Sequence, residues 1–462
     1  MNDNLRNKVY QFLDAALPTM GLTRFPAQIE ALLERFMVAE YGPQYLNDTT
    51  TLNRLGSQLE SIWNARSDGN RIRWKPEAHL AYLIGMAALD FHKVPHVLKQ
   101  IFRNQGFPTN RPIRILDVGA GPGIAAWSTL FFFELLANAR EMAGIVGDER
   151  RVEIELHHLD SSPEALDLYR KLVHAYKPGV PHFSFDLGSR LQIQLTDQIR
   201  VADLLGHEEF DLIIFSHVLS ELPGEDPAGP AKLLTRFVAH LNASGSLVLV
   251  ETPPMNQVHQ FHRLKSLVVQ QGLKLFGPCA SLSASPSGPI CQDCVSSQLD
   301  QIHGVSGIRR LLEAIGGRTF ESLDKSNRWV WGVFRKDGAV AHPGFHDLGS
   351  TGVDLKSLID SPDHDRVDIV VQIARREQTP MVHYQICDQS TPIESCALTF
   401  EGSGQNIVLG LGDVLHLKNV KVDRNSLGES NAPSKKIYLV VDARTSMASL
   451  VARMPVTDEV HG

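Results

Sequence analysis

Three glycines that directly follow a short apolar run carry the clearest chemical implication in this chain. Gly119, Gly121 and Gly123 stand at alternate positions after the apolar residues 115–118 and before residues 124–140, which have helical periodicity. A glycine at such a strand-to-helix turn lets the backbone come close to a ligand, because no Cβ stands in the way. The spacing therefore predicts a cofactor-binding loop.

Two carboxylates accompany this loop. Asp117 precedes the first glycine by two residues, and Asp160 ends the next apolar run, residues 152–159. A dinucleotide-binding turn needs a small residue at position 124, where Ile124 stands, and an acid about 20 residues further on. The G-x-G-x-G spacing with these two acids is instead similar to that of class I methyltransferases, which hold S-adenosylmethionine. In that arrangement Asp160 accepts hydrogen bonds from both ribose hydroxyls.

The rest of the expected cofactor site follows other predicted strands. Asp203 is expected to contact the adenine amino group, although Asp186 competes for that place. Ser216 ends the apolar run 210–216 and is assigned to the cofactor site. His217 follows it and is predicted to act in catalysis, as a base or a donor to the substrate. A structural histidine that lines the edge of the sheet is the alternative.

Strands alternate with helices from about position 114 to position 250, which predicts a parallel α/β sheet covered on both faces. Ligands of such sheets bind beyond the carboxyl ends of the strands. Five short strands at 367–373, 381–387, 395–400, 414–422 and 435–441 favour a small barrel such as the OB-fold. The expected division is an N-terminal helical region (1–77), a class I methyltransferase domain with a Rossmann-like sheet (78–275), a cysteine-containing metal-binding insertion (276–345) and a β-rich, OB-like C-terminal domain (346–462).

Three of the five cysteines lie in or beside one loop that is rich in Gly, Pro and Ser. Cys291 and Cys294 form a C-x-x-C pair, and Cys279 lies upstream. Three thiolates do not complete a tetrahedral site, so a fourth ligand is needed, with Cys387 as the first choice and Cys396 as the second. Thiolate ligation fits either a [4Fe–4S] cluster or Zn²⁺, and unrelated thiols are the alternative.

A wider resemblance covers about residues 78–300. Residues 114–127 (RILDVGAGPGIAAW) resemble the cofactor loop of the methyltransferase-like proteins of the mitochondrial ribosomal small subunit and their bacterial relatives. Residues 216–222 (SHVLSEL) and 247–252 (LVLVET) are further similar stretches. The sequence departs from the family where Cys-Pro-His is replaced by Cys-Ala-Ser from position 279, and where Trp-Cys-His-Phe is replaced by Asp-Cys-Val from position 293.

The resemblance implies an iron–sulfur cluster on Cys279, Cys291, Cys294 and Cys387. It also implies action on ribosomal RNA or on the small ribosomal subunit. Two alternatives stay open at this point. One is a non-catalytic, S-adenosylmethionine-binding factor for ribosome assembly, and the other is a methyltransferase that acts on a small molecule or a protein.

Net charge and hydropathy limit the kinds of partner that this protein is expected to bind. The chain has 45 Lys and Arg against 52 Asp and Glu, a formal charge of −7, so RNA binding requires a local basic face. Residues 416–453 offer one, with seven basic residues and three acids. No apolar run approaches the roughly 18 residues of a membrane helix, so no membrane partner is expected. The first residues lack a targeting pattern, which predicts a cytoplasmic protein. The sequence does not indicate an oligomeric state.

Overall fold

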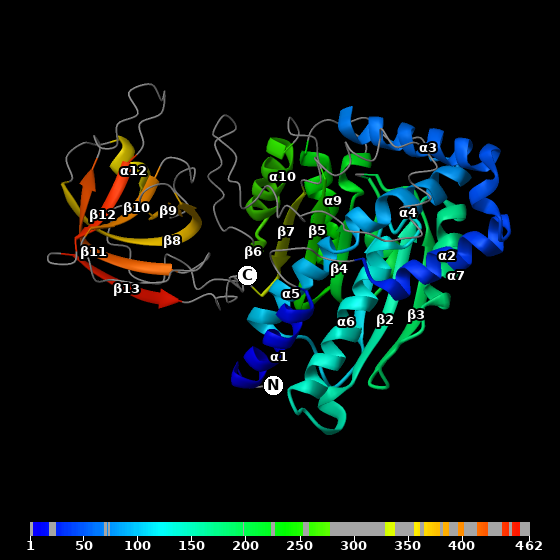
Figure 1. The fold of residues 1–462 in the computed structure, drawn as a ribbon, viewed down its shortest axis with the longest axis horizontal. Helices are drawn as coiled ribbons and strands as arrows, with labels where there is room; N and C mark the ends of the chain where they lie inside the picture. The colour runs from blue at the N-terminus through cyan, green and yellow to red at the C-terminus, as the bar shows by residue number, and fades with distance from the viewer. Residues whose placement is uncertain are drawn as a thin grey trace. The chain divides into compact units, whose positions relative to one another are not determined.

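The structure is a computed structural model that describes residues 3–17, 25–68, 72, 74–196, 198–222, 227–252, 258–277, 329–337, 355–360, 365–378, 382–387, 396–401, 414–423, 437–442 and 446–452. The chain forms two compact units (Figure 1). One is Met1–Pro278 with Val295–Ala341, and the other is Cys279–Cys294 with His342–Gly462. The expected four-part division at 77, 275 and 345 stays a prediction.

The first unit contains a seven-stranded sheet in the order β3-β2-β1-β4-β5-β7-β6. Its strands are β1 (Ile113–Val118), β2 (Val152–Asp160), β3 (Phe183–Gln192), β4 (Phe210–Ser216), β5 (Leu241–Glu251), β6 (Lys274–Gly277) and β7 (Val330–Arg335). Strands β1 to β5 run parallel, whereas β7 is antiparallel to both β5 and β6. The strand order reverses between β1 and β4, which is where open α/β sheets form a ligand crevice.

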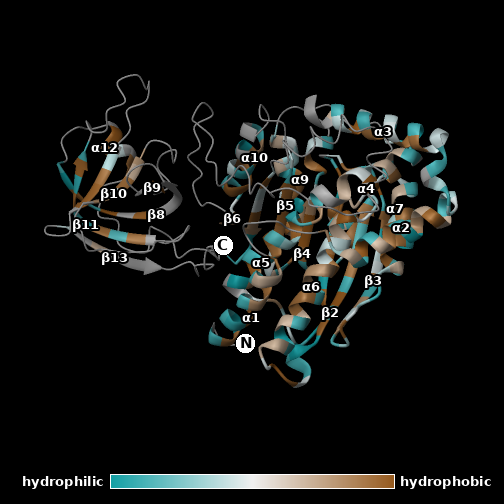
Figure 2. Cartoon of the chain, in the orientation of Figure 1, coloured by the Kyte–Doolittle hydropathy of each residue, from teal (hydrophilic) through white to brown (hydrophobic). Residues whose placement is uncertain are grey.

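Helices cover the sheet and form the N-terminal part of the unit. They are α1 (Asp3–Ala16), α2 (Ala27–Tyr41), α3 (Thr49–Asp68), α4 (Pro76–Asp90), α5 (Lys93–Gln105), α6 (Ile124–Met142), α7 (Pro163–Ala175), α8 (Val201–Leu205), α9 (Ala228–Val238) and α10 (Val258–Gln270). Figure 2 shows hydrophobic residues along the strands and hydrophilic ones on the outer helices. None of the helices within the described ranges is long and apolar enough to cross a bilayer.

Local sequence explains why these elements start and end where they do. Every residue of β4 before Ser216 is buried, as expected for a strand that is covered on both faces. Helix α7 begins after Ser162, whose side chain accepts a hydrogen bond from the Ala165 amide, and Pro163 occupies the first helical turn. The strands expected at 115–118, 152–159 and 210–216 are confirmed. Strand β3 was not predicted. Its sequence includes Gly188 and Arg190, so the apolar and polar residues do not give a clear strand pattern.

The second unit contains a six-stranded sheet with a closed ring of pairings. Its strands are β8 (Arg366–Gln378), β9 (Val382–Cys387), β10 (Cys396–Glu401), β11 (Val414–Asp423), β12 (Ile437–Asp442) and β13 (Met447–Ala452), and a short helix, α12 (Leu355–Asp360), precedes them. They pair in the order β12-β10-β9-β8-β11-β13, and β12 also pairs with β11. The five runs expected as strands therefore form the ring, and β13 is an addition. The OB-like identity of this unit stays a prediction.

Candidate functional site

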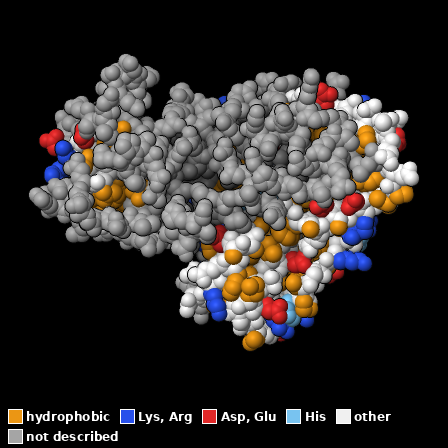
Figure 3. All heavy atoms as spheres, viewed as in Figure 1, with side chains coloured by type: hydrophobic (Ala, Val, Ile, Leu, Met, Phe, Trp, Pro, Cys, Tyr) orange, Lys and Arg blue, Asp and Glu red, His pale blue; other side chains and the backbone are white. Residues whose placement is uncertain are grey.

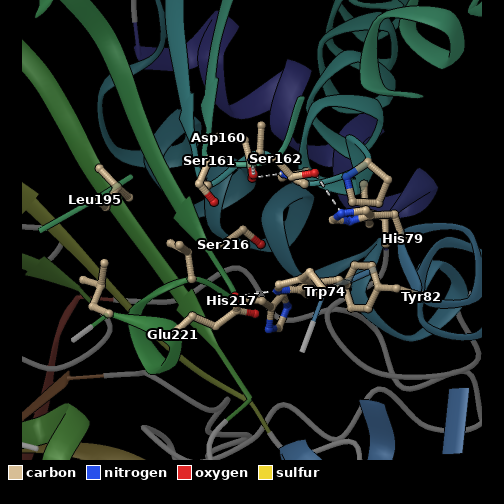
Figure 4. Close-up of a pocket in the computed structure, with 18 of the residues that line it drawn as sticks. Trp74, His79, Tyr82, Asp160, Ser161, Ser162, Leu195, Ser216, His217 and Glu221 are labelled. Atoms are coloured by element: carbon tan, nitrogen blue, oxygen red, sulfur yellow. Dashed lines mark hydrogen bonds between the residues drawn. The ribbon is translucent and has the colours of Figure 1, made fainter. Parts of the chain in front are cut away.

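A crevice lies beyond the carboxyl ends of β1, β2 and β4, at the point where the strand order reverses. Side chains from these strand ends face side chains from the N-terminal helical part across it (Figure 4). The lining consists of Trp74, His79, Tyr82, residues 119–122, Ile124, Ala125, residues 160–162, residues 193–195, residues 216–218, Glu221 and Leu222. The position is the one that the sequence predicts for the cofactor.

The glycine loop forms the floor of the crevice after β1. Gly119, Gly121 and Gly123 all have positive φ, at 68°, 51° and 96°. A Cβ on Gly119 would lie 2.3 Å from Cγ2 of Val218, whereas a Cβ on Gly121 would meet no atom within 4 Å. Gly119 is thus required by packing inside the protein. Gly121 faces open space in the crevice, as a residue does where the backbone must approach a ligand.

Asp160 ends β2 and is tied to the glycine loop. Its Oδ2 accepts a hydrogen bond from the Gly121 amide at 2.8 Å, and its Oδ1 accepts one from the Ser162 amide at 2.9 Å. These two bonds fix the orientation of the carboxylate at the crevice. A carboxylate has about four acceptor positions, so the group retains capacity for donors on a ligand, such as ribose hydroxyls.

Asp117 lies in β1 but does not line the crevice. The residue is 2% exposed, and neither carboxylate oxygen has a hydrogen-bond partner among the described residues. Burial raises the pKa of the Asp117 carboxyl to about 8, and the negative charge of Asp160 adds to this shift. In the parallel register Asp117 pairs with His158, whose ring stacks on Tyr169 with centroids 4.2 Å apart. At neutral pH this carboxyl is therefore mostly protonated.

His217 follows β4 and has an unusual backbone, with φ at 58°. Its ring is held between two other elements. Nδ1 lies 3.4 Å from Oγ1 of Thr252, and Nε2 lies 3.4 Å from Oδ1 of Asp90. The ammonium of Lys93 contacts both partners, at 2.5 Å from Asp90 and 2.7 Å from Thr252. Both ring nitrogens thus face protein groups, and a role of His217 as a base stays a prediction. Ser216 lines the crevice beside it.

Sequence reasoning missed the contribution of the N-terminal helical part. The indole of Trp74 stacks on the imidazole of His79, with centroids 4.8 Å apart and planes 1° from parallel. Trp74 donates from Nε1 to Oε2 of Glu221 at 2.7 Å, which spans the crevice. Two aromatic residues and a histidine at 74, 79 and 82 were a usable signal, since a histidine is otherwise rare inside so apolar a helix as α4.

The two aspartates expected near the adenine lie elsewhere. Asp203 is exposed on α8, and Asp186 is exposed on β3. Neither is among the residues that line the crevice described above. Instead, residues 193–195, which directly follow β3, line the crevice, and Leu195 is labelled in Figure 4. An adenine contact by Asp203 stays a prediction.

Only some of the expected metal ligands belong to the part of the chain that the structure describes. Cys279, Cys291 and Cys294 lie outside the described residues. Cys387 ends β9, and Cys396 begins β10, where its side chain is buried in the core of the ring. Within the described ranges no cluster of three or more His, Cys, Asp or Glu side chains is placed to hold a metal ion.

The chain is similar to a known protein family and, more distantly, to several solved structures. Residues 91–280 match the family described as a methyltransferase domain. A S-adenosylmethionine-dependent methyltransferase from Aquifex aeolicus is similar at 17% identity, over 45% of this chain and 92% of that chain, with a TM-score of 0.28. A TehB-like enzyme from Corynebacterium glutamicum is similar at 14% identity, over 61% and 97%, with a TM-score of 0.25.

None of the curated proteins matches the chain significantly. The family match contains the glycine loop, Asp160 and the segment after β4, and therefore most of the crevice. Residues 91–280 are thus similar to a methyltransferase domain, and they contain β1 to β5, the parallel part of a Rossmann-like α/β sheet.

Proposed function

We propose that this protein transfers a methyl group from S-adenosylmethionine to ribosomal RNA or to a component of the small ribosomal subunit. The crevice at the reversal of strand order supports the first half of the proposal. It combines a glycine that faces open space, an oriented carboxylate at the end of β2, and the family match of residues 91–280. When bound, the cofactor supplies a methyl group on a sulfonium sulfur.

The residues of the chain hold and orient the reactants. Asp160 would bind the ribose, the backbone at Gly121 would leave room for the cofactor, and Ser216 would line the same site. Alignment of a nucleophile with the methyl carbon accounts for several kcal/mol of the barrier in reactions of this kind. The Trp74–Glu221 bridge bounds the space in which an acceptor meets the cofactor.

Calorimetric titration with S-adenosylmethionine tests this site. We expect wild type to bind, and Asp160→Ala to bind about 10- to 100-fold more weakly, because charge-assisted hydrogen bonds to the ribose are lost. Asp148→Ala is the matched control, since Asp148 is an exposed aspartate outside the crevice. Absence of heat with the wild-type protein would remove the methyltransferase proposal.

The ribosomal target rests on the sequence resemblance and on one surface feature. Strand β11 exposes Lys418 and Lys421 in the second unit, whose ring of strands is the basis for proposing an OB-like barrel. OB-folds bind single strands along basic surfaces. On the described part of the face in Figure 3, basic and acidic side chains are interspersed. Transfer of a labelled methyl group to purified small subunits, with large subunits and free amino acids as controls, separates this target from the alternatives. Retained cofactor binding without transfer would favour an assembly factor.

An iron–sulfur cluster on Cys279, Cys291, Cys294 and Cys387 belongs to the same proposal. Anaerobic purification followed by iron and sulfide analysis is its test. We expect Cys291→Ser to lose the metal and Cys396→Ser to keep it, since Cys396 packs in the core of the second unit. Zinc in place of iron, or no metal in the wild type, would overturn the cluster.

A further inference from the structure

A hydrogen bond spans the outer part of the crevice. The indole of Trp74 donates from Nε1 to Oε2 of Glu221 at 2.7 Å, and both side chains line the crevice (Figure 4). Both are partly exposed, whereas His79 and Tyr82, the ring neighbours of Trp74 in the crevice wall, are only 4% and 8% exposed. A ligand that comes from solvent therefore meets the Trp74–Glu221 pair before it meets the inner wall.

The Glu221 side of this pair is fixed by the protein interior. Glu221 is the last residue of the short 3₁₀ helix η3 (Leu219–Glu221). The buried Glu251 carboxylate accepts a hydrogen bond from the Leu219 amide at 2.7 Å, and its second oxygen lies 3.5 Å from Oγ of Ser220. Because a buried carboxylate holds the first two residues of η3, we expect the backbone of Glu221 to stay in place while ligands exchange.

The Trp74 side is held less firmly. Trp74 precedes α4, and the opposite end of that helix is anchored in the interior, where buried Asp90 accepts a hydrogen bond from Lys93 at 2.5 Å. Among the described residues, the indole is held by its bond to Glu221 and by ring contacts with its neighbours, at a partly exposed position. An opening of the crevice therefore starts at the Trp74 side chain.

We propose that Trp74 and Glu221 form a gate, which must open for S-adenosylmethionine to enter the crevice and for S-adenosylhomocysteine to leave it. This inference rests on the proposed function. The groups that close the gate all belong to the protein, so the gate closes with and without a ligand inside. A weakened gate then raises the rates of entry and exit by the same factor and leaves the affinity unchanged.

Trp74→Phe tests the gate, because phenylalanine keeps a ring beside His79 but has no N–H for Glu221. A hydrogen bond to a charged group changes an equilibrium by a factor of about 10 to 100. We expect association and dissociation of radiolabelled S-adenosylhomocysteine each to become faster by about this factor, with the Kd changed less than about twofold. Rapid mixing measures association, and a chase with unlabelled ligand measures dissociation.

Three further variants assign the effect to the hydrogen bond. Glu221→Gln keeps an oxygen that accepts from the indole but loses the charge, so its rates should lie between those of wild type and Trp74→Phe. Glu221→Ala removes the acceptor and should match Trp74→Phe, which keeps the test decisive if Trp74→Phe does not fold. Trp63→Phe is the matched control and should have wild-type rates, because Trp63 packs on the core from α3 and does not line the crevice.

The pattern of rates distinguishes a gate from other roles. Faster dissociation with an unchanged association rate would make Trp74 an ordinary ligand contact and overturn the gate. Wild-type rates in both Trp74→Phe and Glu221→Ala would remove the gate and leave the methyltransferase proposal intact. A wild-type protein that does not bind S-adenosylhomocysteine would remove both.

Discussion

At the scale of single residues, two aspartates that hold similar positions near strand ends differ in how deeply they are buried. Asp117 and Asp160 end or nearly end neighbouring strands, and the sequence pattern predicts both. Only Asp160 lines the crevice, whereas Asp117 is enclosed beneath it. Local sequence predicts which strand end carries an acid, but it does not predict which side chain the packing of α7 will cover.

The burial of Asp117 has a consequence for stability. Its folded-state pKa of about 8 lies above that of an unfolded aspartate, about 3.9, so the folded state holds the proton over this range. Folding stability from this group is therefore fully present below about pH 4 and is lost as the pH rises through about 8.

Asp117→Asn is expected to raise stability at alkaline pH, because the amide cannot ionise. We predict a gain of a few kcal/mol in the free energy of unfolding at pH 8, which disappears toward pH 4. Urea unfolding of both proteins across this pH range is the measurement. A variant that is less stable than wild type at pH 8 would show that the ionised carboxylate has a stabilising partner.

The residue type of His79 was a signal in the sequence, but its contact in the fold could not be predicted, for a different reason. Its partner Ser162 is 83 residues away, and nothing in the periodicity of α4 marks the one position that meets the start of α7. Long-range contacts of this kind depend on the tertiary packing and not on a local pattern.

At the scale of elements, the loop after β1 is the segment whose structure the sequence predicts most clearly. Strand, glycine spacing and following helix are all local features, and all are confirmed. Strand β3 and the crevice residues 193–195 after it were missed, because a half-exposed edge strand lacks the continuous apolar run of β4.

The glycines of this loop should differ in their sensitivity to substitution. Gly119→Ala adds a Cβ against Val218 at a positive φ, and we predict a loss of about 3 kcal/mol in stability. Gly121→Ala has only the backbone penalty of about 1 kcal/mol, but its methyl group projects into the crevice.

Thermal unfolding and calorimetry of the pair separate these effects. Gly121→Ala should fold and bind S-adenosylmethionine weakly, whereas Gly119→Ala should show mainly a lower melting temperature. Normal cofactor affinity in Gly121→Ala would mean that the cofactor does not approach this part of the loop.

At the scale of the first unit as a whole, a buried ion pair within the N-terminal helices also contacts residues that follow β4 and β5. Lys93 and Asp90 are almost fully enclosed, and Lys93 also reaches Thr252 beyond β5. The burial of these two residues could not be predicted from the sequence, because a single Lys and a single Asp near a helix end usually face solvent.

Lys93→Met is expected to lower the free energy of unfolding by about 3–5 kcal/mol, because it leaves the Asp90 carboxylate buried without its cation. The double variant Asp90→Asn/Lys93→Met should recover much of this loss. Denaturant unfolding is the measurement, with Lys171→Met on the exposed side of α7 as a control. A single variant as stable as wild type would show that the pair does not hold the helices on the sheet.

A co-crystal structure with S-adenosylhomocysteine examines the central claim most directly. The nucleoside should lie beyond the ends of β1, β2 and β4, with its ribose against Asp160 and its amino-acid chain along Gly121. An empty crevice, or the ligand bound anywhere else on the chain, would contradict the account.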